Sequence, residues 1–321
     1  MSKFIVTGAR GYVARRLIRR LVSDGHEVVG LTRGENTDGE AEPGCCEVLV
    51  GDYTNEALLT NTVSGAQAVF HLAARAHLPS LDKEDGALFH AANVVPTLAM
   101  ARACAQTNVA RFVMVSTIGV LGNRTGDVAF SDSSSLAPVD HYAISKANAE
   151  RCLIEVLSDV NCSYCILRPP LVYGPGSPGN FASLVEIAAK AKLIPLAGVR
   201  VPRTFIHVDH LVDALIVAAT HPAASRRTFV IADDADTSVA EIIGSATRIF
   251  GREHWRVVAI PKMLLRALGI LAGQRTRVDK LLAPLRVDGS GFREVTGWHP
   301  GRSTSEAIEA TLRDWPINPN P

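Results

Sequence analysis

Short apolar runs alternate with longer amphipathic segments through the first half of the chain. The short runs do not alternate apolar and polar residues, which is typical of strands covered on both faces in a parallel sheet. We predict strands over residues 4–7, 27–32, 48–51, 68–72, 111–116 and 164–167. We predict helices over residues 11–23, 55–63, 87–106, with an interruption at Pro96, and 142–157. This order predicts an α/β fold with a doubly wound parallel sheet of right-handed βαβ units.

The pattern changes after Arg168-Pro169-Pro170. Residues 171–180 are rich in glycine and proline, which is typical of a loop that leads the chain out of a sheet. Beyond it we predict helices near 181–190, 208–220, 238–250, 262–271 and 304–314, and strands near 204–207, 228–232 and 256–259. We therefore expect a first domain over 1–170, to which segments such as 203–220 return. Residues 171–321 are expected to form mainly a smaller mixed α/β lobe over the carboxyl edge of the sheet.

The composition is that of a globular protein and excludes some functions. Hydrophobic residues make up 47% of the 321 residues, which argues against disorder. Lys and Arg (33) balance Asp and Glu (32), whereas a nucleic-acid-binding surface usually shows a basic excess. No apolar run reaches the roughly 20 residues of a membrane span, and the N-terminus leads directly into a strand. We expect a cytoplasmic protein without a membrane span.

The six cysteines form no metal-binding pattern. Cys162 and Cys165 make a single C-x-x-C inside a strand-like run, and a zinc site needs further ligands at a matching spacing. We therefore expect reduced thiols and no metal.

A glycine-rich turn joins the first predicted strand to the first predicted helix. Residues 7–14 read T-G-A-R-G-Y-V-A: Gly8 allows a tight turn, Gly11 allows close approach to a pyrophosphate, and Ala14 allows close helix–strand packing. An anion is favoured at the helix N-terminus that follows. The position between a strand and an amphipathic helix is what a dinucleotide-binding loop requires. The expected cofactor contacts in this turn are Gly8, Arg10, Gly11, Tyr12 and Val13.

The end of the second strand favours NADP(H) over NAD(H). An Asp or Glu there usually binds the ribose 2′-hydroxyl of NAD, whereas a nearby Arg accommodates the 2′-phosphate of NADP. Here the strand ends at Thr32-Arg33, and Arg10 can approach the same phosphate from the other side. Two guanidinium groups suit a dianion. If Arg33 is only a solvated loop residue, either cofactor binds. Asp52, after the third strand, is expected to meet the adenine.

Tyr142 and Lys146 lie four residues apart, on one face of a predicted helix. A free tyrosine has a pKa of about 10, and a neighbouring lysine lowers that pKa, which makes the phenol a general acid/base near neutral pH. Ser116-Thr117 ends a strand at the carboxyl edge, where doubly wound sheets place their sites. We expect a hydroxyl of this pair to hold the substrate oxygen that Tyr142 protonates.

With these features the chain resembles the extended short-chain dehydrogenases/reductases of the NAD-dependent epimerase/dehydratase family, which have a Rossmann domain. The resemblance runs almost end to end. Its other motifs are H-L-A-A (71–74), Asn93, V-S-T (115–117), Y-A-I-S-K (142–146), L-R-P-P-L-V-Y-G-P-G (167–176), G-N-F (179–181), R-T-F-I-H-V-D-H-L (203–211) and G-W-H-P (297–300). Ala14, Gln67 and Pro96 depart from the family pattern, but none of them removes a group needed for hydride transfer.

The resemblance implies roles for individual residues. Tyr142 would be the acid/base, Lys146 its partner and a ligand of the cofactor ribose, and Thr117, with Ser116 beside it, the substrate-holding hydroxyl. Asn180 and Arg203 would contact the diphosphate of a nucleotide sugar, expected to be UDP-linked. Further cofactor contacts would be Tyr53, Leu72, Ala73, Ala74, Asn93, Ser116, Tyr142, Lys146, Pro169, Leu171 and Val172. Family members commonly pair the helices corresponding to 87–106 and 142–157 across a dimer, so we expect a homodimer.

The residues after Thr117 restrict the reaction. Sugar dehydratases and decarboxylating relatives have acidic residues there, whereas this chain has Ile118-Gly119-Val120. Reduction of a 4-keto group and 4-epimerisation need only a hydride and one proton, so both remain. The chain is similar to a bacterial subgroup that contains nucleotide-sugar 4-reductases and proteins described as UDP-glucose 4-epimerases.

The basic residues at the second strand favour the reductase. The expected reaction is NADPH-dependent reduction of a UDP-linked 4-keto-6-deoxy-N-acetylhexosamine for surface polysaccharide (O-antigen) synthesis. The alternative is an NAD-dependent 4-epimerase of UDP-hexoses or UDP-N-acetylhexosamines. A non-catalytic NADP(H)-sensing protein is a more remote alternative, because such relatives typically lack the tyrosine–lysine pair.

Overall fold

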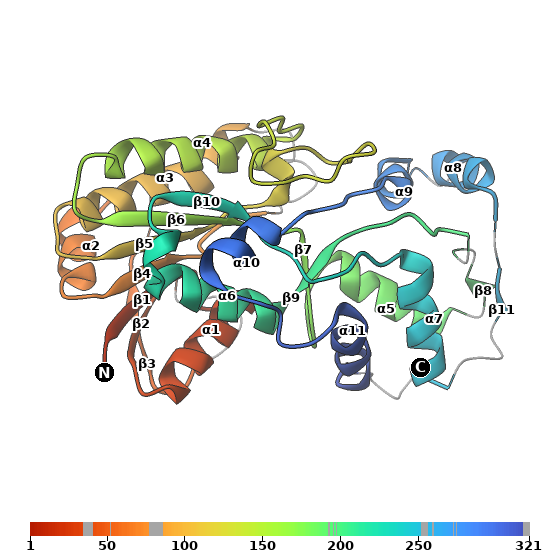
Figure 1. The fold of residues 1–321 in the computed structure, drawn as a ribbon, viewed down its shortest axis with the longest axis horizontal. Helices are drawn as coiled ribbons and strands as arrows, with labels where there is room; N and C mark the ends of the chain where they lie inside the picture. The colour runs from red at the N-terminus through yellow and green to blue at the C-terminus, as the bar shows by residue number, and fades with distance from the viewer. Residues whose placement is uncertain are drawn as a thin grey trace.

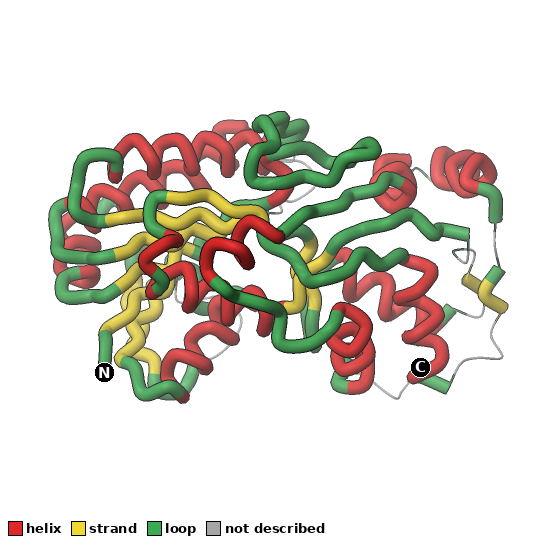
Figure 2. Tube along the Cα trace, in the orientation of Figure 1, coloured by secondary structure: helices red, strands yellow, loops and turns green. Residues whose placement is uncertain are grey.

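The computed structural model describes residues 1–34, 41–51, 53–76, 86–191, 193–194, 196, 198–251, 256–258, 260–271, 273 and 275–316. In these residues the chain forms two lobes side by side (Figure 1). One lobe is a sheet flanked by helices, and the smaller lobe consists of helices and very short strands (Figure 2). Over the described ranges, no helix is long and apolar enough to cross a membrane.

Seven parallel strands form the central sheet in the order β10-β6-β5-β4-β1-β2-β3. The strands are β1 (Lys3–Thr7), β2 (Glu27–Thr32), β3 (Cys45–Leu49), β4 (Ala68–His71), β5 (Arg111–Val115), β6 (Ser163–Arg168) and β10 (Arg227–Val230). This arrangement confirms the predicted doubly wound, Rossmann-type sheet. The strand order reverses between β1 and β4, and doubly wound sheets bind ligands at the carboxyl ends of the strands beside such a reversal.

Alternate side chains of the central strands enter two separate cores. Phe4 and Val6 of β1 pack with α1 (Tyr12–Ser23) and α6 (Val208–Thr220). Ile5, between them, packs with the layer on the other face. That layer consists of α2 (Glu56–Val63), α3 (Gly86–Ala105) and α4 (His141–Leu157), and Figure 1 shows α3 and α4 opposite α1 and α6. Burial on both faces explains the uninterrupted apolar runs in the sequence.

The smaller lobe is built around α5 (Asn180–Lys190), α7 (Val239–Ile249) and α11 (Thr304–Arg313), which share one apolar cluster. A second cluster joins β8 (Leu193–Ile194) to α8 (Lys262–Leu271) and α9 (Arg275–Leu282), and β8 pairs with β11 (Arg256–Val257). Between the lobes, β7 (Leu171–Tyr173) pairs with β9 (Phe205–His207) (Figure 1). The last helix before α11, α10 (Ser290–Thr296), inserts Phe292 into the core of the sheet lobe.

The predicted elements differ from the observed ones in a few places. The helix predicted as interrupted at Pro96 continues through it, since α3 covers 20 residues and the proline removes only the one hydrogen bond that its missing N–H would donate. The strand predicted at 48–51 lies at 45–49, because pairing with β2 sets its ends, with Cys45 opposite Val28 and Leu49 opposite Thr32. The pattern did not predict β7, β8, α9 or α10, which are short.

The lobe that contains the sheet is not continuous in sequence. Both α6 and β10 follow residue 170, yet α6 packs on α1 and β10 pairs with β6. The division of the chain into domains at residue 170 stays a prediction.

Candidate active site

The glycine turn lies at the carboxyl end of β1 and leads into α1. Gly8 has a φ of +66°, and a Cβ on it would lie 3.0 Å from backbone atoms of Ala73, closer than side chains normally pack. Gly11 is the N-cap of α1, so the first N–H groups of the helix lack helical acceptors. With no side chain at either position, a phosphate has room against the helix N-terminus. The turn therefore fits the pyrophosphate of a dinucleotide.

A buried chain of hydrogen bonds holds β1 and β4 together behind this turn. The Thr7 hydroxyl accepts the Ala73 N–H at 3.0 Å and lies 3.0 Å from Nδ1 of His71. On the other side of the ring, Nε2 of His71 lies 2.9 Å from Oγ1 of Thr97, which donates to the Asn93 carbonyl. Since the Thr97 proton is used there, His71 carries its proton on Nε2 and accepts from Thr7. Burial, with the charge of Lys146, lowers the pKa of His71 to about 3, so the ring is neutral.

Asn93 joins the loop after β4 to the helix that carries Tyr142. Its Oδ1 accepts the Arg75 N–H at 2.7 Å, and its Nδ2 donates to the Arg75 carbonyl at 3.3 Å and to the Ser145 hydroxyl at 2.9 Å. Ser145 in turn donates to the Tyr142 carbonyl at 2.7 Å. These bonds engage the amide of Asn93 within the protein, so the structure gives this predicted cofactor contact a role in positioning α4.

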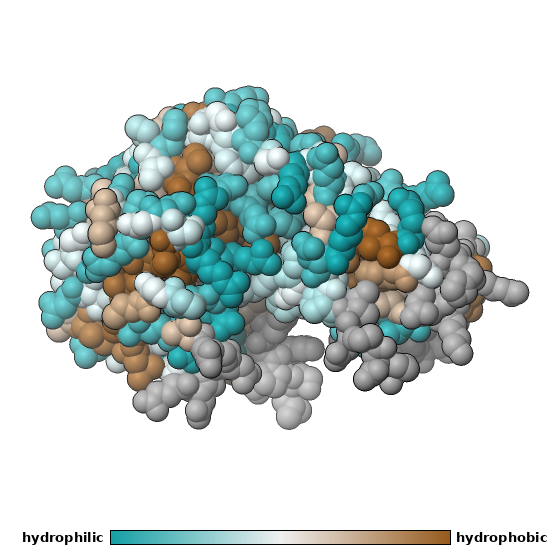
Figure 3. Space-filling model, turned by 90° about the horizontal axis from the view of Figure 1, so that it is seen from below, coloured by the Kyte–Doolittle hydropathy of each residue, from teal (hydrophilic) through white to brown (hydrophobic). Residues whose placement is uncertain are grey.

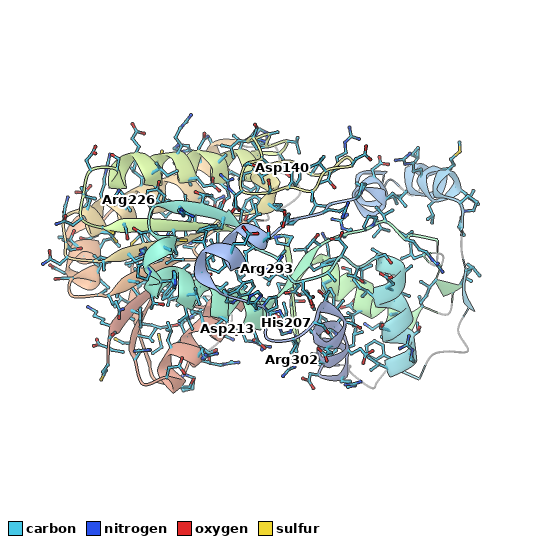
Figure 4. All side chains as sticks on the ribbon, in the orientation of Figure 1. Asp140, His207, Asp213, Arg226, Arg293 and Arg302 are labelled. Carbon is cyan, nitrogen blue, oxygen red and sulfur yellow. The ribbon has the colours of Figure 1, made fainter. Side chains whose placement is uncertain are left out.

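Tyr142 and Lys146 come from the first two turns of α4. Asp140, labelled in Figure 4 at the end of α4 nearer the smaller lobe, is the N-cap and accepts the Ala143 N–H at 2.8 Å. The Tyr142 ring lies 6.4 Å from the ring of Phe89 on α3. Burial, with the charge of Asp140, raises the pKa of Tyr142 to about 12. The spacing from Lys146 predicts a lowered pKa for Tyr142, whereas burial and the charge of Asp140 shift that pKa in the opposite direction.

Lys146 is almost completely buried, at 1% exposed. Burial lowers the pKa of its ammonium group to about 8, and the carboxylate of Glu150 opposes the shift. Glu150, one turn further along α4, binds Arg168 at the end of β6 with an N–O distance of 2.6 Å. Tyr142, Lys146 and Glu150 are thus spaced at i, i+4 and i+8, one turn apart along α4.

The hydroxyls of Ser116 and Thr117 follow β5 at the carboxyl edge of the sheet. Oγ1 of Thr117 accepts the Gly119 N–H at 3.1 Å and caps a single 3₁₀ turn, Ile118–Val120. Oγ of Ser116 is buried and has no hydrogen-bond partner among the described residues. A buried hydroxyl without a partner is costly to leave unpaired, and a ligand oxygen would satisfy it.

The two predicted ligands of a 2′-phosphate have different surroundings. Arg33, after Thr32 at the end of β2, is exposed. Arg10 instead binds Glu47 of β3: Nε lies 3.3 and 3.1 Å from the carboxylate oxygens, and Nη2 lies 2.8 Å from Oε2. Thr32 is buried and its carbonyl accepts the Val50 N–H at 2.8 Å. Of the two arginines predicted to bind a 2′-phosphate, Arg10 is therefore paired with the carboxylate of Glu47.

Other predicted cofactor contacts surround the same edge. Asp52 lies outside the described residues, and Tyr53 beside it is buried with a φ of +67°. Tyr12 donates to the Pro175 carbonyl at 3.4 Å, which brings the start of α1 to the loop after β7. The Pro169 carbonyl accepts the Ile118 N–H at 2.9 Å. Val13, Leu72, Leu171 and Val172 are half-buried, Ala73 is buried and Ala74 is exposed.

The two predicted substrate ligands belong to the second half of the chain. Asn180 is the first residue of α5 and is exposed, after a Gly179 N-cap. Arg203 is half-buried, and its Nη1 donates to the Ala283 carbonyl at 2.9 Å. Burial lowers the pKa of its guanidinium group. Figure 4 labels His207 at the junction of the lobes, on the strand that follows Arg203. Seen from below, hydrophilic side chains cover the surface between the lobes (Figure 3).

Two residues near the site escaped the sequence analysis. Glu150 could have been found, because its spacing from Tyr142 and Lys146 places all three on one helical face. Glu47 could not, because its meeting with Arg10 depends on the register that sets Gly30 opposite Glu47 in neighbouring strands.

Comparison with known proteins identifies the family. The model of the NAD dependent epimerase/dehydratase family matches residues 4–232. A UDP-glucose 4-epimerase of Vibrio cholerae is 28% identical over 317 residues, which cover 97% of this chain and 95% of that protein.

Solved structures agree in fold. The UDP-glucose 4-epimerase of Thermotoga maritima with UDP-glucose has a TM-score of 0.78 at 21% identity, with 97% of this chain and 98% of that chain covered. The UDP-glucuronic acid 4-epimerase of Bacillus cereus in complex with NAD has a TM-score of 0.77 at 20% identity, with 97% and 98% covered. The expected nicotinamide-dependent enzyme class is confirmed, and the chain belongs to the NAD dependent epimerase/dehydratase family.

Proposed function

We propose that this protein is an NAD-dependent 4-epimerase of UDP-hexoses or UDP-N-acetylhexosamines. The observation that carries the proposal is that α4, with Tyr142 and Lys146 in its first two turns, contacts the turn Ile118–Val120 that follows the Ser116-Thr117 hydroxyls, and that this turn has no carboxylate. Such a site can move one proton at a sugar hydroxyl, and the turn Ile118–Val120 provides no second acid to eliminate water. The Vibrio cholerae and Thermotoga maritima relatives, both UDP-glucose 4-epimerases, support the same reaction.

In this proposal the residues of the chain handle the proton. Tyr142 removes the proton of the sugar 4-hydroxyl and later returns it, while Thr117 or Ser116 hydrogen-bonds the same oxygen. Because burial holds the pKa of Tyr142 at about 12, the phenolate needs positive charge nearby, which Lys146 supplies. Glu150 and Arg168 keep α4 in place against β6. A nicotinamide cofactor would be held at the turn of Gly8 and Gly11 and by Lys146, and when bound it would supply reversible hydride transfer at C4.

We infer NAD rather than NADP as the cofactor. A 2′-phosphate needs positive charge beside the end of β2, and the Arg10 guanidinium there is paired with Glu47. The sequence predicts a preference for NADP(H) from Arg10 and Arg33. Because Arg10 is paired with Glu47, that prediction now depends on Arg33.

A second candidate is the NADPH-dependent 4-keto reductase expected from the sequence. The observation in its favour is that β2 ends at Thr32 with the exposed Arg33 next, and without an acid at that position to hold a ribose diol. A reductase uses the same Tyr142 proton but consumes one NADPH in each turnover.

One assay separates the two reactions. The purified protein is incubated with UDP-glucose or UDP-N-acetylglucosamine without added nucleotide, and separately with NADPH and a UDP-4-keto-6-deoxy-N-acetylhexosamine. An epimerase produces the C4 epimer in the first incubation, and in the second it does not consume one NADPH for each sugar. Turnover only in the second incubation would identify the reductase, and nucleotide binding without turnover in either would leave the sensing protein.

We further propose a homodimer formed through α3 and α4, in the cytoplasm. Leu88 and Val95 of α3 and Ile144 and Ile154 of α4 are each between 36% and 40% exposed, which leaves apolar area on this pair of helices. Light scattering after size exclusion should give twice the 34.3 kDa chain mass; a monomer at micromolar concentration would contradict the dimer.

A further inference from the structure

The ion pair between Arg10 and Glu47 lies where the glycine turn meets the end of β2. The N–H groups of Gly8 and Ala9 both donate to the Leu31 carbonyl, at 3.0 and 3.3 Å, which fixes the turn against this strand end. Arg10 follows directly in the turn, and Thr32 and Arg33 follow directly in the strand. In Rossmann folds, this end of the second strand is the part that meets the adenosine ribose.

Glu47 reaches Arg10 from the neighbouring strand by passing over a glycine. Gly30 of β2 is opposite Glu47 of β3 in the sheet register. A Cβ on Gly30 would lie 2.7 Å from the Ala9 Cβ, 3.1 Å from Cys45 Sγ and 3.7 Å from the Glu47 Cγ. Any side chain at position 30 would press against Ala9 of the glycine turn and against the Glu47 side chain. Because Gly30 has no side chain, the Glu47 carboxylate of β3 can reach the edge of the cofactor site.

The pair is accessible enough to exchange partners. The side chains of Arg10 and Glu47 are 21% and 15% exposed, so water and a ligand phosphate can reach them. The guanidinium uses both Nε and Nη2 on the carboxylate, which is the fork geometry that it would otherwise offer to a phosphate. A 2′-phosphate therefore has to compete with Glu47 for Arg10, and it also approaches the negative charge of the carboxylate.

We propose that Glu47 is a specificity-determining residue that disfavours NADP(H) relative to NAD(H) by holding the guanidinium of Arg10. The inference rests on the nicotinamide site of the proposed function. An acid at the end of β2 usually selects for NAD, and here we assign that role to Glu47 on β3. Glu47 would act on the 2′-phosphate by holding Arg10 and by charge repulsion. Among the described residues, the end of β2 itself provides Thr32 and Arg33, which do not select against a phosphate.

The test is a competition between the two nucleotides in four proteins. Wild type, Glu47→Gln, the double variant Glu47→Gln with Arg10→Met, and Glu27→Gln are each equilibrated with equimolar excess NAD and NADP, starting from NAD-loaded and from NADP-loaded protein. The nucleotides released on denaturation are then quantified by mass spectrometry. Glu27 is exposed at the opposite end of β2, so its variant loses the same charge away from the site.

We expect Glu47→Gln to raise the bound NADP/NAD ratio at least tenfold, about 1.4 kcal/mol, because the charge that holds Arg10 and repels the phosphate is removed. The double variant should lose most of that gain, and Glu27→Gln should stay within twofold of wild type. A ratio within twofold of wild type in Glu47→Gln would overturn the proposal. An equal rise in Glu27→Gln, or a gain that persists in full without Arg10, would overturn it as well.

The readout is independent of turnover. A protein that shifts its nucleotide ratio as expected but does not epimerise UDP-sugars would leave the Glu47 role intact and remove the proposed reaction. Conversely, epimerase activity with unchanged nucleotide ratios would remove only the role of Glu47.

Discussion

Two arginine–glutamate pairs lie at the same sheet and differ in how far they are buried. Arg168 of β6 binds Glu150 of α4 at 2.6 Å, with side chains 10% and 3% exposed. Arg10 binds Glu47 at 2.8 Å, with side chains 21% and 15% exposed. The first pair lies beside the buried Lys146, where no solvent can replace a lost partner; the second borders solvent, where water can. This difference indicates that the buried pair at the centre of the sheet keeps Lys146 and α4 in place. The partly exposed pair at the outer strands β2 and β3 can instead influence which cofactor binds.

The largest effect on stability is expected when the buried pair is broken. Glu150→Gln removes the carboxylate that binds Arg168 and opposes the buried charge of Lys146, which costs about 3–5 kcal/mol and lowers the melting temperature by roughly 10 °C. Glu155→Gln, an exposed change on the same helix, is the control and should change little. Differential scanning calorimetry measures both; equal melting temperatures would mean that the central pair is no more essential than a surface charge.

Removing the phenol hydroxyl of Tyr142 should abolish the reaction and leave the cofactor site around Arg10 and Glu47 intact. Tyr142→Phe keeps the ring packed near Phe89 but deletes the acid/base, so turnover should fall by about 10²–10⁴-fold. Nucleotide binding should persist. Tyr164→Phe, on β6 at the same sheet, serves as the matched control. Full activity in Tyr142→Phe, measured by conversion of the C4 epimers, would contradict the assignment of the acid/base.

Neutralising Lys146 should stabilise the protein while it inactivates it. The pKa of Lys146 falls from an unfolded value of 10.5 to about 8, so below pH 8 the folded state bears the cost of a buried ammonium group. Lys146→Met should add about 3 kcal/mol at pH 7, and the gain should disappear as the pH rises from 8 to 10.5. Melting curves across this range test it, with the exposed Lys190→Met as the control; a gain independent of pH would show that packing, not charge, causes it.

The smallest stability effect is expected at the outer pair. Glu47→Gln should change the free energy of unfolding by less than about 1 kcal/mol, as for partly exposed ion pairs. Urea unfolding of this variant beside Glu150→Gln gives the comparison directly. A loss as large as that of Glu150→Gln would mean that the outer pair is structural and cannot exchange its partner for a phosphate.

The sequence was sufficient for the features that are local in the chain. The glycine turn, the Tyr142–Lys146 spacing and six strands of the sheet follow from periodicity and from residues close in sequence. The seventh strand, β10, was expected in the smaller lobe, and only its pairing with β6 places it in the sheet. What it missed depends on registers and packing set by the whole sheet. Glu47 meets Arg10 only because β3 pairs with β2, and the pKa of Tyr142 rises because of burial, which residue spacing does not reveal.

The residues between the lobes were also beyond the sequence. Tyr173, His207, His210 and Asp233 form one buried cluster, in which the Tyr173 hydroxyl donates to Asp233 at 2.9 Å and His210 Nδ1 lies 2.8 Å from the same carboxylate. They come from β7, β9, α6 and the segment after β10. Only the fold brings them together.

The most direct test of the account uses UDP-glucose or UDP-N-acetylglucosamine carrying deuterium at C4, incubated with the purified protein and no added nucleotide. Proton NMR and mass spectrometry then follow the C4 configuration and the label. If Tyr142 moves the proton while a tightly held nicotinamide carries the hydride, the C4 epimer forms and keeps its deuterium at C4. Absence of the epimer, or an epimer that has exchanged its C4 deuterium with solvent, would contradict the account.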